Sequence, residues 1–132
     1  MNAAPASLAA TILALERAAL DRWGQGDPAG FLEICAPEVT YLDPFLTQRI
    51  EGLPALTAYY ESLRGQVKID RDELLAPLVQ GAGDAAVLSF NYVAHIGAKC
   101  LRWHCTEVYR QIDQAWRIVH THWSLLAEGA GA

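Results

Sequence analysis

Four long extended segments separated by very short breaks make up the second half of the chain, and they limit the fold more than any other feature. The segments cover residues 70–80, 85–96, 99–112 and 115–125. The breaks fall at residues 81–84, 97–98 and 113–114, and each contains the turn-forming residue glycine or aspartate. Connections this short join antiparallel neighbours. The second half therefore predicts a consecutive antiparallel meander.

The first half instead predicts helices with two short extended pieces between them. Apolar residues recur at spacings of three and four over residues 7–23, which is typical of an amphipathic helix. Asp27 and Pro28 favour the start of a short second helix, and Pro54 favours a third that ends near residue 63. Residues 38–43 and 50–52 are predicted to be short strands. Helices followed by strands indicate an α+β fold.

The composition indicates one folded domain over residues 1–132 with an excess of apolar side chains. Hydrophobic residues are 52% of the chain and charged residues only 19%, against an ordinary charged share of about 25%. This excludes an intrinsically disordered chain. The apolar excess predicts a thick core, a cavity lining or a subunit interface.

Charge and cysteine content limit the classes of partner that the protein can bind and the cellular compartment in which we expect it. The net charge is −5 and lysine and arginine do not cluster, so we expect no nucleic acid and no membrane as partner. The Ala-rich start has no basic region and continues in helical register, which favours a helix over a signal peptide. An odd set of three cysteines favours reduced thiols, and hence a cytoplasmic protein.

Two segments carry a resemblance to a known family. Residues 43–60 run from Asp43-Pro44 through Gly52 to Tyr59 and Tyr60, and residues 116–124 end in Trp-Ser. The predicted order is a strand, an Asp-Pro loop, a glycine, an aromatic-bearing helix and a last strand. This order resembles the nuclear transport factor 2-like superfamily, in particular its SnoaL-like and ketosteroid isomerase-like branches. The resemblance covers about residues 8–125.

This resemblance implies a cone-shaped α+β barrel, with three N-terminal helices packed into a strongly curved antiparallel sheet around an apolar pocket. It also implies a homodimer through the outer face of the sheet. Fold alone does not define function. Three functions therefore stay open: an isomerase, cyclase or lyase acting on a small apolar carbonyl-containing metabolite, a non-catalytic module that binds such a ligand, and a purely structural dimer.

Asp43 is the first candidate catalytic residue. In the branch that this segment resembles, the aspartate of the Asp-Pro step is a general base, and an apolar pocket suits that role because desolvation raises a carboxyl pKa. The alternative is that the Asp43 side chain caps its own turn. By the same resemblance the two enolate-stabilising donors of the isomerases fall at Ala19 and Thr106, and losing one such donor typically costs ~10²–10³ in rate.

His104 is the second candidate. Strand alternation puts it on one face with Thr106, and the resemblance places that face inward, opposite Asp43. Ligand contacts are then expected from the pocket-facing side chains, which are Tyr60, Ser89, Asn91, Thr106, Val119 and Trp123. Cys105 and Glu107 are expected to point outward. His120 and His122 share a strand face but have no third ligand at a convincing spacing, so neither a metal nor another cofactor is predicted.

Overall fold

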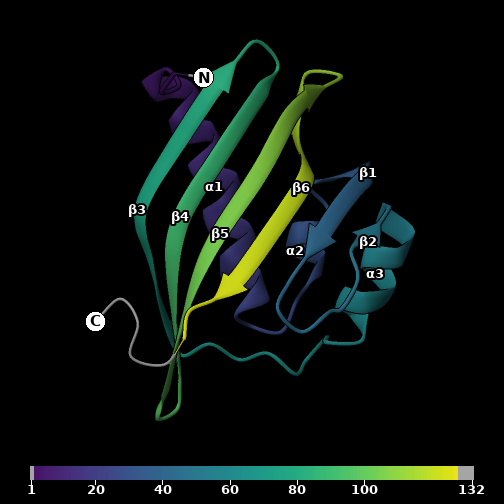
Figure 1. Cartoon of the computed structure of the whole chain (residues 1–132), viewed down its shortest axis with the longest axis vertical. Coiled ribbons are helices and arrows are strands. Elements are labelled where there is room, and N and C mark those ends of the chain that lie inside the picture. Colours follow the sequence, from purple (N-terminus) through teal and green to yellow (C-terminus); the bar gives the residue numbers. More distant parts are fainter. Residues whose placement is uncertain (1, 128–132) are drawn as a thin grey trace.

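The computed structural model describes residues 2–127, which form three helices and six strands (Figure 1). In chain order these are α1 (Ala6–Trp23), α2 (Ala29–Leu32), β1 (Cys35–Leu42), β2 (Ile50–Glu51), α3 (Leu53–Glu61), β3 (Arg71–Ala82), β4 (Ala85–Ile96), β5 (Lys99–Ile112) and β6 (Ala115–Leu125). None of these helices is long and apolar enough to cross a lipid bilayer.

The strands form one open sheet in the order β2-β1-β6-β5-β4-β3. The long strands β3 to β6 are the predicted antiparallel meander. The sheet as a whole is mixed, because β1 pairs with β6 in parallel. That pairing joins segments roughly eighty residues apart, with Thr40 opposite His120, and so no turn signal in the sequence announces it.

One face of the sheet is covered and the other is open. Figure 1 shows α1 running behind the long strands, with α3 beside β1 and β2. Ile12 and Leu20 of α1 are fully buried, as are Leu88 of β4 and Tyr109 of β5. The core therefore lies between the helices and this inner face of the sheet, in the cone-shaped α+β arrangement that the sequence predicts.

The register of β5 decides which residues reach the core, and it corrects one prediction. Trp103, Cys105 and Glu107 face the helices, and Cys105 and Glu107 are buried. The outward orientation predicted for Cys105 and Glu107 is therefore wrong. Because side chains alternate strictly along a strand, an error of one residue moves every side chain to the other face.

Close packing of Gly26 against Gly65 holds the loop after α3 against the end of α1. Gly26 has a φ of +85°, and a Cβ there would lie 3.0 Å from the Cα of Gly65. The Gly65 amide donates to the Gly26 carbonyl at 2.9 Å, and the Ile69 amide donates to the Gly24 carbonyl at 2.8 Å. Only glycine accepts both the positive φ and the close approach. The contact holds this loop where Leu63, Val67 and Ile69 can line a cavity.

Candidate functional site

The inner face and the helices enclose a cavity of about 380 Å³ that opens near the end of β1. This volume lies within the range of small-molecule sites. Nine of the seventeen described lining residues are aromatic, seven are aliphatic and one, Asp43, is charged. The aromatic residues are Trp23, Phe31, Tyr41, Phe45, Tyr59, Tyr60, Tyr92, Trp103 and Trp123. The cavity therefore suits a largely apolar ligand with a single polar contact.

Asp43 follows the last residue of β1 and is held by three donors. The hydroxyls of Tyr41 and Tyr59 both donate to Oδ2 at 2.7 Å. The backbone N–H of Phe45 donates to Oδ1 at 2.8 Å. The side chain thus caps its own turn and also lines the cavity. The turn cap expected as the alternative is present, and the role of general base stays a prediction.

The two tyrosines that contact Asp43 are held in their protonated form. Burial raises the pKa of Tyr41 far above its usual value, and the negative charge of Asp43 raises it further. Burial also raises the pKa of Tyr59, with added contributions from its hydrogen bond to Asp43 and from the charge of that residue. Both hydroxyls therefore remain donors to the carboxylate over the physiological pH range.

Aromatic rings form two connected walls around this carboxylate. On the helix side, Tyr41 and Tyr60 meet at a centroid distance of 5.3 Å and an interplanar angle of 89°. On the sheet side, Trp103 and Trp123 meet at 6.1 Å and 87°. Phe45 is 68% exposed and packs edge-on against Trp103 at 5.9 Å, which places it at the mouth. Edge-to-face packing of this kind stabilises the walls without filling the space between them.

Three of the predicted site residues line this cavity: Asp43, Tyr60 and Trp123. Tyr60 is buried and its ring packs against Trp23 at 5.0 Å. Trp123 contacts the rings of Phe90, Tyr92 and Trp103. These three residues come from the end of β1, from α3 and from β6, so the fold brings together positions that lie far apart in the chain.

Four other predicted site residues lie together on the outer face of the sheet. Ser89, Asn91, His104 and Thr106 line a separate, shallow hollow of about 310 Å³. His104 is exposed, and its Nδ1 lies 2.8 Å from Asn91 Oδ1. The inward orientation that the resemblance implied for these side chains is wrong, because Ser89, Asn91, His104 and Thr106 all line this outer hollow. His104 is separated from Asp43 by the sheet itself.

Val119 is displaced by an irregularity in β6. The pairing of β5 with β6 shifts between Val108 and Tyr109, which lie opposite His120 and Ile118, so Val119 is the extra residue of a bulge. Val119 is not among the described residues that line the cavity. A bulge adds a residue without changing the local composition, so the sequence gives no sign of the displacement.

Several residues that line the site were missed. Tyr59 precedes the predicted Tyr60 on α3 and supplies one of the hydroxyls on Asp43. Trp103 would have been assigned to the cavity if the alternation of β5 had been placed one residue later. A tryptophan flanked by Arg102 and His104 was itself the available signal, because the large apolar side chain belongs on the covered face.

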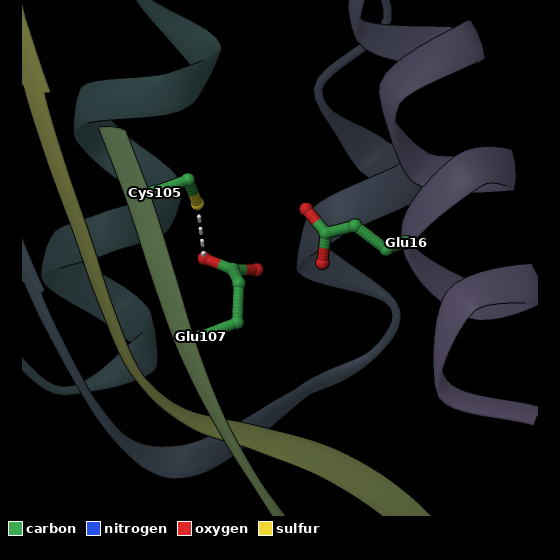
Figure 2. A group of neighbouring side chains, drawn as sticks. All are labelled: Glu16, Cys105 and Glu107. Atoms are coloured by element: carbon green, nitrogen blue, oxygen red, sulfur yellow. Dashed lines mark hydrogen bonds between the residues drawn. The ribbon is translucent and has the colours of Figure 1, made fainter. Parts of the chain in front are cut away.

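A pair of fully buried carboxyl groups lies deeper inside the cone. Figure 2 shows Glu16 of α1 pointing toward Glu107 and Cys105 of β5. Tyr109 donates to Glu16 Oε1 at 2.8 Å. Glu107 Oε1 accepts from the Thr121 hydroxyl and from the Cys105 thiol, whose Sγ lies 3.7 Å away. The Oε2 atoms of both glutamates have no partner among the described residues.

Burial raises the pKa of both carboxyl groups in this pair. It raises the pKa of Glu16 from 4.5 to about 7, although hydrogen bonds with Glu107 and Tyr109 partly oppose the shift. Burial also raises the pKa of Glu107 well above its usual value, and the nearby charge of Glu16 raises it further. Two carboxyl groups this close in a dry interior do not both ionise, so the pair retains at least one proton.

Among the described residues, this cluster also has ligand atoms close enough together to hold a metal ion. The ligand atoms of Glu16, Cys105 and Glu107 all lie within 4.8 Å of one another. A metal would need the Cys105 thiolate. Burial raises the pKa of that thiol well above its usual value, which disfavours the thiolate. The contacts that the structure shows for these side chains are hydrogen bonds from Tyr109, Thr121 and the Cys105 thiol.

Comparison with known proteins supports the fold described above. A family model for the calcium/calmodulin dependent protein kinase II association domain matches residues 9–127. No functionally curated protein matches the sequence. A solved structure described as a "putative ketosteroid isomerase" from Parabacteroides distasonis ATCC 8503 is 37% identical with a TM-score of 0.80, over 89% of this chain and 86% of that one.

Two further solved structures share the fold at lower identity. An NTF2-like protein of unknown function from Pseudomonas putida KT2440 is 22% identical, with a TM-score of 0.83 over 96% of this chain and 92% of that one. The CaMKII hub of S. rosetta is 23% identical, with a TM-score of 0.76 over 93% and 100%. The superfamily predicted from the sequence is therefore confirmed. The chain belongs to the calcium/calmodulin dependent protein kinase II association domain family, within the NTF2-like superfamily.

Proposed function

We propose that this protein binds a small, largely apolar molecule in the aromatic cavity, with Asp43 as the contact for its polar group. The observation that carries the proposal is one carboxylate set in a lining that is otherwise aromatic and aliphatic. Sites with many apolar walls and a few fixed polar groups are typical of ligand pockets. We place this function in the cytoplasm, because Cys35, Cys100 and Cys105 are all free thiols.

A catalytic version of the proposal makes Asp43 a general base that removes a proton next to a ligand carbonyl, as in an isomerase or lyase. Such a step needs donors aimed at the enolate oxygen. The hydroxyls of Tyr41 and Tyr59 instead donate to Asp43 itself. Ala19 has no donor in its side chain, and Thr106 lies on the outer face. These contacts favour binding without catalysis.

A small apolar β,γ-unsaturated ketone separates the two versions. We expect the wild-type protein to bind it, seen as a rise in melting temperature that depends on ligand concentration. We also expect isomerisation, followed by the absorbance of the conjugated product, to be no faster than with the Asp43→Asn variant. Turnover that Asp43→Asn abolishes while binding persists would establish the base instead. Absence of binding to a panel of apolar ligands would contradict the whole proposal.

Self-association is a second candidate function, favoured by the family match and by hub and association domains among the structural neighbours. Leu75 and Leu78 of β3 are 43% and 46% exposed, and they pair with Asn91 and Ser89 on the outer face. A homodimer through this face is therefore part of the proposal. Sedimentation equilibrium gives the mass of the particle in solution, and a monomer at all concentrations would rule this candidate out.

A further inference from the structure

We infer that the polar group of the ligand is a cation, namely an ammonium group attached to an apolar body. This inference rests on the proposed function, because it names the class of molecule that the aromatic cavity takes. Its basis is the charge of the cavity, the free hydrogen-bonding capacity of Asp43 and the aromatic rings around that residue.

The first step concerns charge. Asp43 is the only charged side chain among the described lining residues, and no described lysine, arginine or histidine forms an ion pair with it. Asp72, which contacts the lining residue Tyr92, is by contrast already paired with Arg17. A carboxylate beside an apolar cavity without a counterion disfavours an anionic ligand and favours a cationic one.

The second step concerns the hydrogen-bonding capacity of Asp43. An ionised carboxylate offers about four acceptor positions. The hydroxyls of Tyr41 and Tyr59 occupy two on Oδ2, and the Phe45 amide occupies one on Oδ1. One position on Oδ1 remains, and it can only accept. A ligand carbonyl has nothing to donate there, whereas an ammonium N–H can, and charge strengthens that bond.

The third step concerns the rings. A cation within about 6 Å of an aromatic face is attracted by its quadrupole, most strongly by tryptophan. Tyr41 and Tyr59, whose centroids lie 5.8 Å apart, both touch Asp43. Trp103 and Trp123 meet nearly at right angles on the opposite wall. Perpendicular rings of this kind present faces from different sides, as in the aromatic cages that hold quaternary ammonium groups.

Three probes of nearly equal size and different charge test the inference on the wild-type protein. They are phenylpropylamine, phenylpropanol and phenylpropionate, titrated by isothermal calorimetry at low ionic strength. We expect the amine to bind about tenfold more tightly than the alcohol, and the carboxylate to bind most weakly. In Asp43→Asn the amine should lose about tenfold in affinity while the alcohol changes by less than about threefold. Circular dichroism and the melting temperature check that this variant folds.

The outcomes separate this inference from the proposed function. Equal affinity for the amine and the alcohol, or tighter binding of the carboxylate, overturns the cation while leaving the apolar pocket in place. No binding of any probe overturns the cation together with the proposed function. Because the ranking of the three probes is measured on the wild-type protein, the test holds even where Asp43→Asn fails to fold.

Discussion

The protein should lose stability as the pH rises from about 5 to about 8, and the Glu16→Gln variant should lose less, keeping only the share of Glu107. Burial raises the pKa of Glu16 in the folded state to about 7 from the ordinary value of 4.5. The folded state then binds more protons than the unfolded state between these two values. The stabilisation is fully present below pH 4.5 and is lost as the pH rises through about 7.

The size of this effect follows from the shift. The difference between 4.5 and about 7 corresponds to a loss of about 3 kcal/mol in the free energy of unfolding. The raised pKa of Glu107 extends the loss to higher pH. An amide at position 16 keeps an acceptor for the Tyr109 hydroxyl and carries no charge, so we expect the variant to fold. Urea denaturation of the wild type and of Glu16→Gln at several pH values measures the difference.

The matched control is Glu38→Gln, because Glu38 is exposed on β1. This variant should reproduce the wild-type dependence of stability on pH. If wild type, Glu16→Gln and Glu38→Gln all show the same slope between about pH 5 and about pH 8, the buried pair does not control the stability of the fold.

The Ala94→Phe variant should abolish ligand binding without unfolding the protein. Ala94 of β4 is buried, lines the cavity and lies opposite Leu101 of β5. A phenyl ring there projects into the cavity of about 380 Å³ and occupies the space of the ligand. We expect affinity for phenylpropylamine to fall at least about a hundredfold, with a stability cost of at most about 3 kcal/mol from imperfect fit. Calorimetry and thermal denaturation measure both quantities.

Asn91→Phe is the control for this substitution. Asn91 lies on the same strand but is exposed on the outer face. The same added ring there leaves the cavity unchanged, so affinity should stay within about threefold of the wild type. An equal loss of binding in both variants, or full binding in Ala94→Phe, would show that the ligand does not occupy the cavity.

The sequence predicted the strands well where turns bound them. The bounds of β4, β5 and β6 agree with the prediction because glycine or Asp-Gln turns separate these strands. The start of β1 at Cys35 was missed, since Pro37 lies inside that strand and proline normally ends regular structure. The parallel pairing of β1 with β6 depends on contacts between distant segments, which no local pattern reveals.

The candidate site was predicted in part, for reasons that particular residues make clear. Asp43 was identifiable because it comes directly after a strand and before Pro44. His104 was placed wrongly because the resemblance assigned its face of β5 to the inside, whereas Trp103, Cys105 and Glu107 lie on the covered face. Glu16 carried a usable signal, since it lies four residues from both Ile12 and Leu20 on the buried side of α1.

The location of bound phenylpropylamine tests the central claim most directly. Nuclear Overhauser effects between the probe and isotopically labelled protein report which side chains lie within a few ångströms of it. We predict contacts from the methylene beside the nitrogen to Tyr59, Trp103 and Trp123, the rings that the inference places around the cation. Contacts to His104 and Ser89 instead would place the ligand on the outer face of the sheet and contradict the account.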